Sequence, residues 1–215
     1  MTTMRSIPTW PFRTWLLASC LLLVACGTLP DKPVRAAVYD FGPGARADTV
    51  AGPAHAAAPI QLGEVEAASA LDSTAVLYRL AYADAQQLQP YAQARWSMPP
   101  AELLRLRLRD TLAPRQLVLR EGSGLHSGEV PTRTLQLELD EFSQVFDAPG
   151  SSVGLVRVNA TVLSPTADGG RLLAQRRFVA QRPAPSPDAA GGVRALTAAS
   201  DVVLSDIAQW LSTLR

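Results

Sequence analysis

The chain has 215 residues and an almost balanced charge, with 20 Lys and Arg against 19 Asp and Glu. Such a balance creates no broad field for nucleic acid or for a strongly charged partner, so we expect neither. The length of residues 26–215 suits one domain preceded by a linker.

The first 25 residues read as a secretory signal peptide. Arg5 and Arg13 give it a basic start without acidic residues, and an apolar stretch follows over residues 15–22. Leu23-Val24-Ala25-Cys26 then resembles the lipobox of bacterial lipoproteins, in which a cysteine directly follows the cleavage site. We therefore expect cleavage after Ala25 and modification of Cys26 by diacylglycerol and an N-acyl chain.

Two alternatives to a lipid anchor remain open. The apolar run is shorter than the roughly 20 residues that a transmembrane helix needs. An ordinary signal peptide could also carry an incidental cysteine. With the anchor, several acyl chains hold the protein stably, since each buried methylene adds about 0.8 kcal/mol. Gly27 stands where aspartate would signal inner-membrane retention, so the periplasmic face of the outer membrane is favoured. Cys20 lies within the leader, so we expect no disulfide in the mature chain.

Residues 26–58 are rich in Gly, Pro, Ala and Asp, a composition that buries little apolar area. We expect them to form a flexible tether of about 30 residues, which could span up to roughly 100 Å when extended. Within it, the alternating segment Ala37–Phe41 suits a short edge strand. We place the folded domain at 59–215, beginning near Pro59.

The first half of the domain reads as strands followed by a helix. The strands are expected at 60–65, 74–81, 87–95 and, after the helix, 117–119. Pro90 confines the third of them to a sheet edge or a bulge. Pro99-Pro100 marks the start of a helix over 99–113. The alternating Leu and Arg residues of 104–109 also fit a strand, but their intrinsic propensity favours the helix.

The second half has a period of two and then a helical period. Three strands, around 135–142, 156–162 and 172–180, are expected to form an antiparallel meander with a bulge at Asp140-Glu141. Leu172, Ala174, Phe178 and Ala180 should share one face. A loop over 183–192 leads to an amphipathic helix whose apolar stripe is Leu196, Ala199, Val203, Ile207, Trp210, Leu211 and Leu214.

This order of elements predicts the fold class. Strands, a helix, more strands and a final helix indicate an α+β two-layer sandwich. We expect a mixed or mostly antiparallel sheet with two helices packed on one face.

Several of these features occur together in one known family. They are the lipobox with its Pro/Gly tether, the segment Tyr39-Asp40-Phe41, the approach from Tyr91 to Trp96 into the Arg/Leu helix, and the meander before an Ala-rich helix. The chain thereby resembles the auxiliary lipoproteins of ABC-type transport systems. Those lipoproteins accompany permeases and mammalian-cell-entry (MCE) domain proteins in lipid trafficking across Gram-negative envelopes.

The resemblance implies a function without catalysis. It implies a lipid-anchored periplasmic accessory subunit, partnered by an ABC permease and ATPase complex and an MCE-domain protein, with room for phospholipid contact. The alternative is a lipoprotein that assists outer-membrane assembly or secretion.

The sequence offers little chemistry of its own. His55 and His126 lie in expected loops, and no spacing typical of metal ligands occurs, so we expect no catalytic base, metal or dissociable cofactor. The Gly-x-Ser-x-Gly pattern at 150–154 falls in a turn between antiparallel strands, whereas a nucleophile elbow needs a strand-to-helix turn. The acids Glu138, Asp140, Glu141 and Asp147 could be paired catalytic carboxylates, but a solvated strand face is the simpler interpretation.

Four residues are candidates for contact with a partner. They are Tyr91, Trp96, Arg105 and Arg109. Trp96 precedes the first helix and could anchor a partner, while the two arginines could pair with acids or lipid headgroups or simply face solvent. The predicted contact surface is the sheet edge 87–96 together with the loop 121–131.

Overall fold

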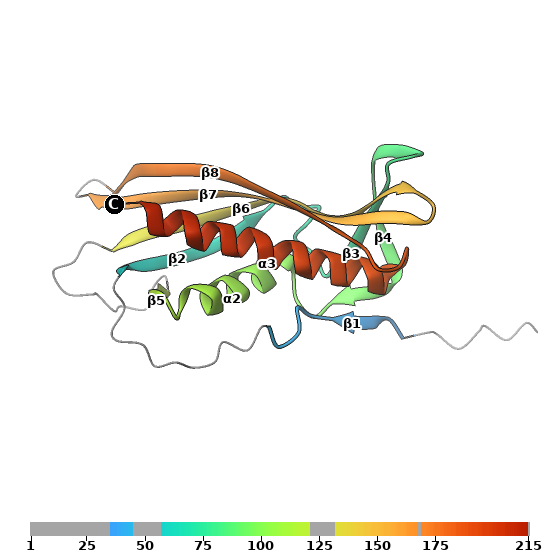
Figure 1. Ribbon diagram of the computed structural model, residues 1–215, viewed down its shortest axis with the longest axis horizontal. Helices are drawn as coiled ribbons and strands as arrows, with labels where there is room; N and C mark the ends of the chain where they lie inside the picture. The colour runs from blue at the N-terminus through green and yellow to red at the C-terminus, as the bar shows by residue number, and fades with distance from the viewer. Residues whose placement is uncertain (1–34, 45–56, 121–131, 167–168, 215) are drawn as a thin grey trace, which may run out of the picture. The chain divides into compact units, whose positions relative to one another are not determined.

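The computed structural model describes residues 35–44, 57–120, 132–166 and 169–214, which form one eight-stranded sheet and two helices (Figure 1). The compact unit that they build begins at Ala36. The elements are β1 Ala37–Tyr39, β2 Ala57–Ala67, β3 Ala75–Leu80, β4 Asp84–Trp96, α2 Pro100–Leu112, β5 Gln116–Arg120, β6 Arg133–Ala148, β7 Ser151–Thr166, β8 Gly169–Pro183 and α3 Ala189–Thr213.

The long strand β6 organises the sheet. One edge of β6 pairs with β7 in antiparallel fashion, and β7 pairs with β8, which confirms the predicted meander. The other edge of β6 pairs first with β2 and then with β3, both parallel to it. Ala67 lies opposite Leu139 and Tyr78 lies opposite Gln144, so β2 and β3 follow one another along the same edge. β5 extends the sheet beyond β2, and β4 followed by β1 extends it beyond β3.

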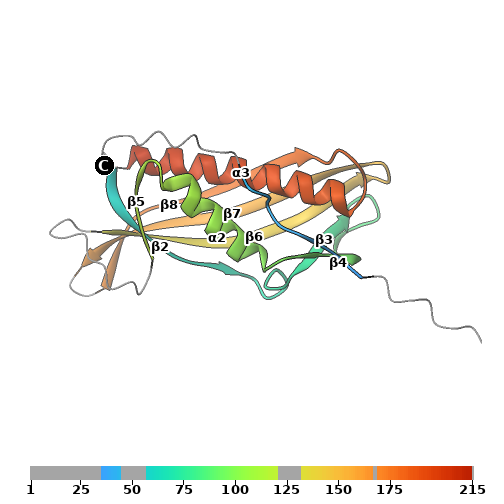
Figure 2. The same ribbon diagram turned by 90° about the horizontal axis from the view of Figure 1, so that it is seen from below.

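Both helices cover the same face of the sheet (Figures 1 and 2), which confirms the predicted α+β class with two helices on one face. α3 packs on β7 and β8, and α2 packs on β2 and β5 while also contacting α3. The helix limits follow from local chemistry. α2 begins at Pro100, where the absent N–H costs nothing because no intrahelical acceptor exists for it. The N-cap of α3 is Asp188, whose carboxylate accepts the N–H of Gly191 at 2.7 Å.

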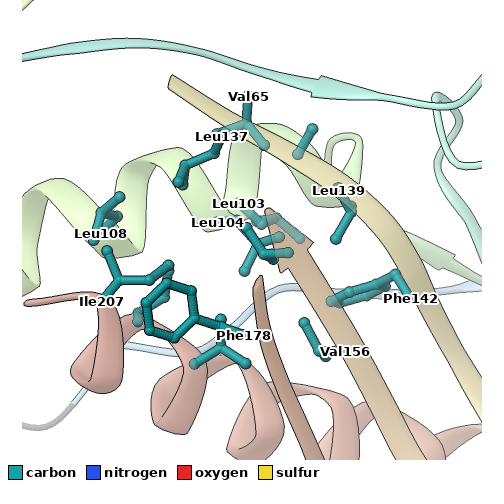
Figure 3. Close-up of a cluster of buried hydrophobic side chains, with 14 of the residues drawn as sticks. Val65, Leu103, Leu104, Leu108, Leu137, Leu139, Phe142, Val156, Phe178 and Ile207 are labelled. Carbon is teal, nitrogen blue, oxygen red and sulfur yellow. The ribbon is translucent and has the colours of Figure 1, made fainter. Parts of the chain in front are cut away.

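The core lies between the helices and the sheet (Figure 3). Alternation along β6 and β7 sends every second side chain toward the helices, so Leu135, Leu137 and Leu139 are buried while Gln136 and Glu138 are not. The register of β6 against β7 shifts between Leu139 and Glu141, as the predicted bulge requires. The predicted α3 stripe from Leu196 to Leu211 is buried, and Asp201, Ser205 and Gln209 face solvent.

Two predictions about the second half are wrong. Leu172 was expected on the buried face, but it is 57% exposed. An extra residue in β8 places Leu172 opposite Leu163 while Ala174 lies opposite Val162, so Leu172 and Ala174 face opposite sides. The predicted loop 183–192 also ends earlier than expected, because Gly191 and Gly192 lie in the first turn of α3.

The N-terminal part of the domain extends further than expected. The edge strand predicted within 37–41 exists as β1, which pairs in parallel with the end of β4. Phe41, just after β1, is buried in the core. A domain that began at Pro59 would therefore lack a piece of its own core, and residues 36–44 belong to the domain rather than to the tether.

Candidate functional site

Several residues of interest lie outside the described part of the chain. Cys26, the expected lipidation site, is one of them, and so are His55, His126 and the whole loop 121–131. The four partner-contact candidates do lie on described elements, and the structure separates them into three different settings.

Trp96 is a core residue and not a surface anchor. It is only 2% exposed, and its ring packs against Phe41 and Phe142 with centroid separations of 5.7 and 5.5 Å, both edge to face. Its indole Nε1 is buried and has no hydrogen-bond partner among the described residues. The prediction that Trp96 meets a partner is therefore wrong. The missed signal is Phe41, which belongs to a segment whose composition is typical of a tether.

Tyr91 belongs to a polar cluster near the C-terminal end of β6. Its hydroxyl donates to Gln144 Oε1 at 2.8 Å, and Gln144 Nε2 donates to Ser152 Oγ at 2.8 Å. The Tyr91 ring also packs on Tyr78, with centroids 4.6 Å apart. Burial, followed by the neighbouring Tyr78 and Asp188, raises the pKa of Tyr91 to about 12. The hydroxyl therefore stays protonated at neutral pH and acts as a donor to Gln144.

Gln144, which is fully buried, was not found from sequence, and Ser152 was noted there only as the serine of the Gly-x-Ser-x-Gly pattern. The start of α3 closes over this amide. A side chain at Gly192 would collide with Gln144 Oε1, so glycine is needed where the helix approaches the strand. The two adjacent glycines were a usable signal for close packing, although they also fit a loop.

Arg105 and Arg109 lie on α2 and are already paired within the helix. Arg105 Nη2 lies 2.8 Å from Glu102 Oε2, and Arg109 Nη2 lies 3.2 Å from Asp110 Oδ1. Arg105 lines a cavity beside Glu138 of β6, whereas Tyr91 contacts Gln144 six positions further along that strand. At about 3.3 Å per residue, the two settings are about 20 Å apart along β6. The candidates do not form one site.

The cavity beside Arg105 has a volume of about 610 Å³. Most of its lining comes from the sheet face opposite the helices, where polar side chains alternate with the buried ones. The lining residues are Leu62, Gly63, Glu64, Glu66, Arg105, Gln136, Leu137, Glu138, Asn159 and Thr161. This mostly polar lining is unlike the apolar walls that an enclosed acyl chain would need.

Asp140 and Glu141 of β6 are held in structural contacts. Asn159 donates to Asp140 Oδ2 at 2.9 Å, and Arg177 Nε lies 3.9 Å from the same oxygen. Glu141 pairs with Arg79 at 3.1 Å on the neighbouring strand β3. These cross-strand partners hold Asp140 and one oxygen of Glu141 in place within the sheet.

The Gly-x-Ser-x-Gly pattern lies at the hairpin between β6 and β7. Ser152 is buried and accepts its hydrogen bond from Gln144, and it does not lie in a strand-to-helix turn. Within the described ranges, no cluster of three or more His, Cys, Asp or Glu side chains could hold a metal ion. Neither helix that the structure describes has the length and apolar character required to cross a bilayer.

Comparison with known proteins identifies structures similar to this chain. Among solved structures, the protein XCC0632 from Xanthomonas campestris, of the DUF330 family, matches with a TM-score of 0.60 and 22% identity, over 76% of this chain and 88% of that one. An uncharacterized protein matches with a TM-score of 0.59 and 15% identity, over 82% of this chain and 99% of that one. At these identities the likeness establishes the fold alone. Comparison with curated proteins gives no match.

A match to a family model is more specific. The model that describes the ABC-type transport auxiliary lipoprotein component matches residues 39–208, from the end of β1 into α3. This span covers most of the core, the Tyr91 cluster, α2 and most of α3. It agrees with the resemblance drawn from the lipobox, the tether and the order of elements, and the chain belongs to the family of ABC-type transport auxiliary lipoprotein components.

Proposed function

We propose that this chain is a non-catalytic, lipid-anchored accessory subunit on the periplasmic face of the envelope, where it assists an ABC permease and ATPase and an MCE-domain protein in lipid transport. The observation that carries the proposal is the family match over residues 39–208, combined with the lipobox-like sequence that ends at Cys26. The outer membrane is the favoured location, because Gly27 follows that cysteine.

The position at which the domain begins limits how far the domain can lie from the membrane that holds its anchor. The compact unit begins at Ala36, about ten residues after Cys26. Ten extended residues span at most about 35 Å. This reach is much shorter than the 100 Å expected for a tether that ran to residue 58. The domain would therefore work close to the membrane that holds its lipid.

A role without catalysis is supported by the chemistry of the described residues. Asp140 and Glu141 of β6 are held by Arg79, Asn159 and Arg177, and Ser152 is a buried acceptor in a hairpin. These polar groups thus have contacts that serve packing and strand pairing. Energy for transport would come from the ATPase subunit of the system.

The anchor can be tested by metabolic labelling. Cells supplied with radiolabelled palmitate should label the wild-type chain and leave a Cys26→Ala variant unlabelled. Density-gradient fractionation of the labelled envelopes should place the protein with the outer membrane. Label on the Cys26→Ala protein would contradict the assigned anchor, and a peak with the inner membrane would contradict the assigned location.

The role as a subunit can be tested by native electrophoresis. In gently solubilised envelopes, the mature lipoprotein, which is smaller than the 22.9 kDa precursor, should migrate in a band of much higher mass. A denaturing second dimension should then separate transport subunits from that same band. Migration of the intact lipoprotein alone or only with copies of itself would contradict the proposal.

A further inference from the structure

The strand β8 forms a long open edge of the sheet. It runs from Gly169 to Pro183 and, within the described residues, pairs only with β7. An edge strand offers unpaired backbone donors and acceptors, which proteins commonly protect with short strands, internal prolines, bulges, charged side chains or a covering element. β8 has one bulge near its start and several arginines, and these charges would repel a basic strand but attract an acidic one. β8 is 15 residues long and has no proline before its last residue. Its outer edge can therefore accept another strand.

The charge of this edge is of one sign. β8 carries Arg171, Arg176, Arg177 and Arg182 and no acidic residue. Only Arg177 has an acidic neighbour among the described residues, at 3.9 Å from Asp140. Arg176 is exposed, and its guanidinium carbon lies 5.1 Å from the centroid of the Phe178 ring.

Apolar side chains accompany these arginines. Leu172 is 57% exposed and Val179 is 50% exposed, both on the sheet face opposite the helices. Unpaired backbone N–H and C=O groups, exposed arginines and exposed apolar side chains thus lie on one strand. Together they would match an extended segment that alternates acidic and apolar residues.

We propose that the edge of β8 binds an extended acidic segment of a partner protein, which adds one strand to the sheet. The proposal rests on the proposed function, since that function requires a protein partner. It places the contact with the partner at β8, on the opposite edge of the sheet from β4.

The edge of β4, which the sequence favoured, is less suited to strand addition. Pro90 removes a backbone donor in the middle of β4, and β1 already pairs with its end from Ala94 to Trp96. The pairing of β4 with β3 is also irregular, with two register shifts. β8 has a single shift against β7, near its start.

A second copy of this chain is a poorer occupant than an acidic segment. Pairing of β8 with β8 would bring two rows of arginines together, and like charges that face each other across strands are destabilising.

A membrane surface is also disfavoured. It would leave the backbone groups of the strand edge without partners.

The test uses the intact lipoprotein in detergent and a fluorescein-labelled ten-residue peptide of alternating Glu and Val. The peptide should bind saturably, and a matching peptide of Lys and Val should not. A double variant, Arg176→Glu with Arg182→Glu, should weaken binding about tenfold or more, because each reversal replaces attraction across the strands with repulsion. The control double variant, Arg35→Glu with Arg115→Glu, makes the same change in charge at exposed positions elsewhere and should bind like wild type.

Hydrogen exchange provides the structural readout. Bound peptide should slow the exchange of amides in β8 and leave those of β4 unchanged. Absence of peptide binding, equal binding by the β8 variant, or protection outside β8 would each overturn the proposal. Binding of phosphatidylglycerol vesicles that is lost in the β8 variant, with no peptide binding, would identify a membrane as the occupant instead.

Recovery of transport subunits from envelopes separates this proposal from the proposed function. If the wild-type chain recovers the subunits and the β8 variant does so equally well, β8 is not the contact and the proposed function stands. If the wild-type chain recovers none while the peptide still binds β8, the edge is a strand acceptor and the proposed function fails.

Discussion

The ring of Phe41 meets the ring of Trp96 edge to face, with centroids 5.7 Å apart at an interplanar angle of 88°. This contact joins the segment after β1 to the end of β4. Arg107 reinforces it from α2, because its Nη2 donates to the Phe41 carbonyl oxygen at 2.6 Å while its Nε lies 3.0 Å from Asp201 of α3. The N-terminal segment is thereby bound to α2 directly and to α3 through Arg107.

Loss of either ring should destabilise the domain. Phe41→Ala and Trp96→Ala should each cost about 3–5 kcal/mol, as expected when a buried aromatic residue is truncated. Val38→Ala is the control, since Val38 is 65% exposed and should change stability by no more than about 0.5 kcal/mol. Urea unfolding followed by fluorescence or circular dichroism measures all three. If the Trp96→Ala protein is as stable as wild type, Trp96 does not belong to the core and the prediction of a surface residue stands.

Removal of the N-terminal segment should have a similar effect. A protein that begins at Ala36 should fold with full stability, whereas one that begins at Pro59 lacks β1 and Phe41 and should unfold at clearly lower urea concentration. The cavity left by Phe41 and the lost pairing of β1 with β4 are the reasons. Equal unfolding midpoints for the two proteins would contradict the inclusion of residues 36–44 in the domain.

The approach of α3 to β6 can be tested with a single methyl group. Gly192→Ala should destabilise the domain by about 1–3 kcal/mol, because the added carbon collides with the buried Gln144 amide. Gly150→Ala is the matched control, since nothing lies within 4 Å of the corresponding position and the backbone there does not have positive φ. If the two variants melt at the same temperature, the close contact between the helix and Gln144 does not exist.

Tyr91 should make stability fall at high pH. Its pKa is about 12 in the folded protein and about 10 in the unfolded chain, so both states keep the proton below pH 10. Between pH 10 and pH 12 only the unfolded chain loses the proton, and stability falls. Tyr91→Phe should remove this part of the alkaline loss.

The same variant should cost about 1–3 kcal/mol at neutral pH, where it leaves Gln144 Oε1 without its donor. The exposed Tyr82 serves as control, and Tyr82→Phe should change neither the stability at neutral pH nor its loss at high pH. Unfolding free energies of both variants, measured from pH 7 to pH 12, test this prediction. An alkaline profile that is the same for wild type and Tyr91→Phe would contradict the assigned environment.

The sequence predicted those parts of the fold that depend on local periodicity. Leu135 and Leu137 alternate with polar neighbours, and Ile207 lies on a helical stripe, so burial follows from spacing alone. The pairing of both β2 and β3 with one edge of β6 depends on contacts that are far apart in the sequence. No local pattern encodes that arrangement.

The errors have the same origin. Phe41 is surrounded by residues typical of a linker, and only its distant contact with Trp96 makes it part of the core. Leu172 looked buried because one extra residue in β8, which reverses the faces, cannot be read from alternation. For the candidate site, the motif at Cys26 was readable from sequence. The long open edge of β8 became evident only once its neighbours were known.

The central claim is that this chain is an accessory subunit of an ABC transport system, and recovery of its partners tests that claim most directly. The intact lipoprotein, tagged at its C-terminus, is purified from detergent-solubilised envelopes, and the proteins that accompany it are identified and quantified by mass spectrometry. We predict an ABC permease, its ATPase or an MCE-domain protein in amounts comparable with the lipoprotein itself. Recovery of the lipoprotein with none of these subunits, or with components of outer-membrane assembly or secretion in their place, would contradict the account.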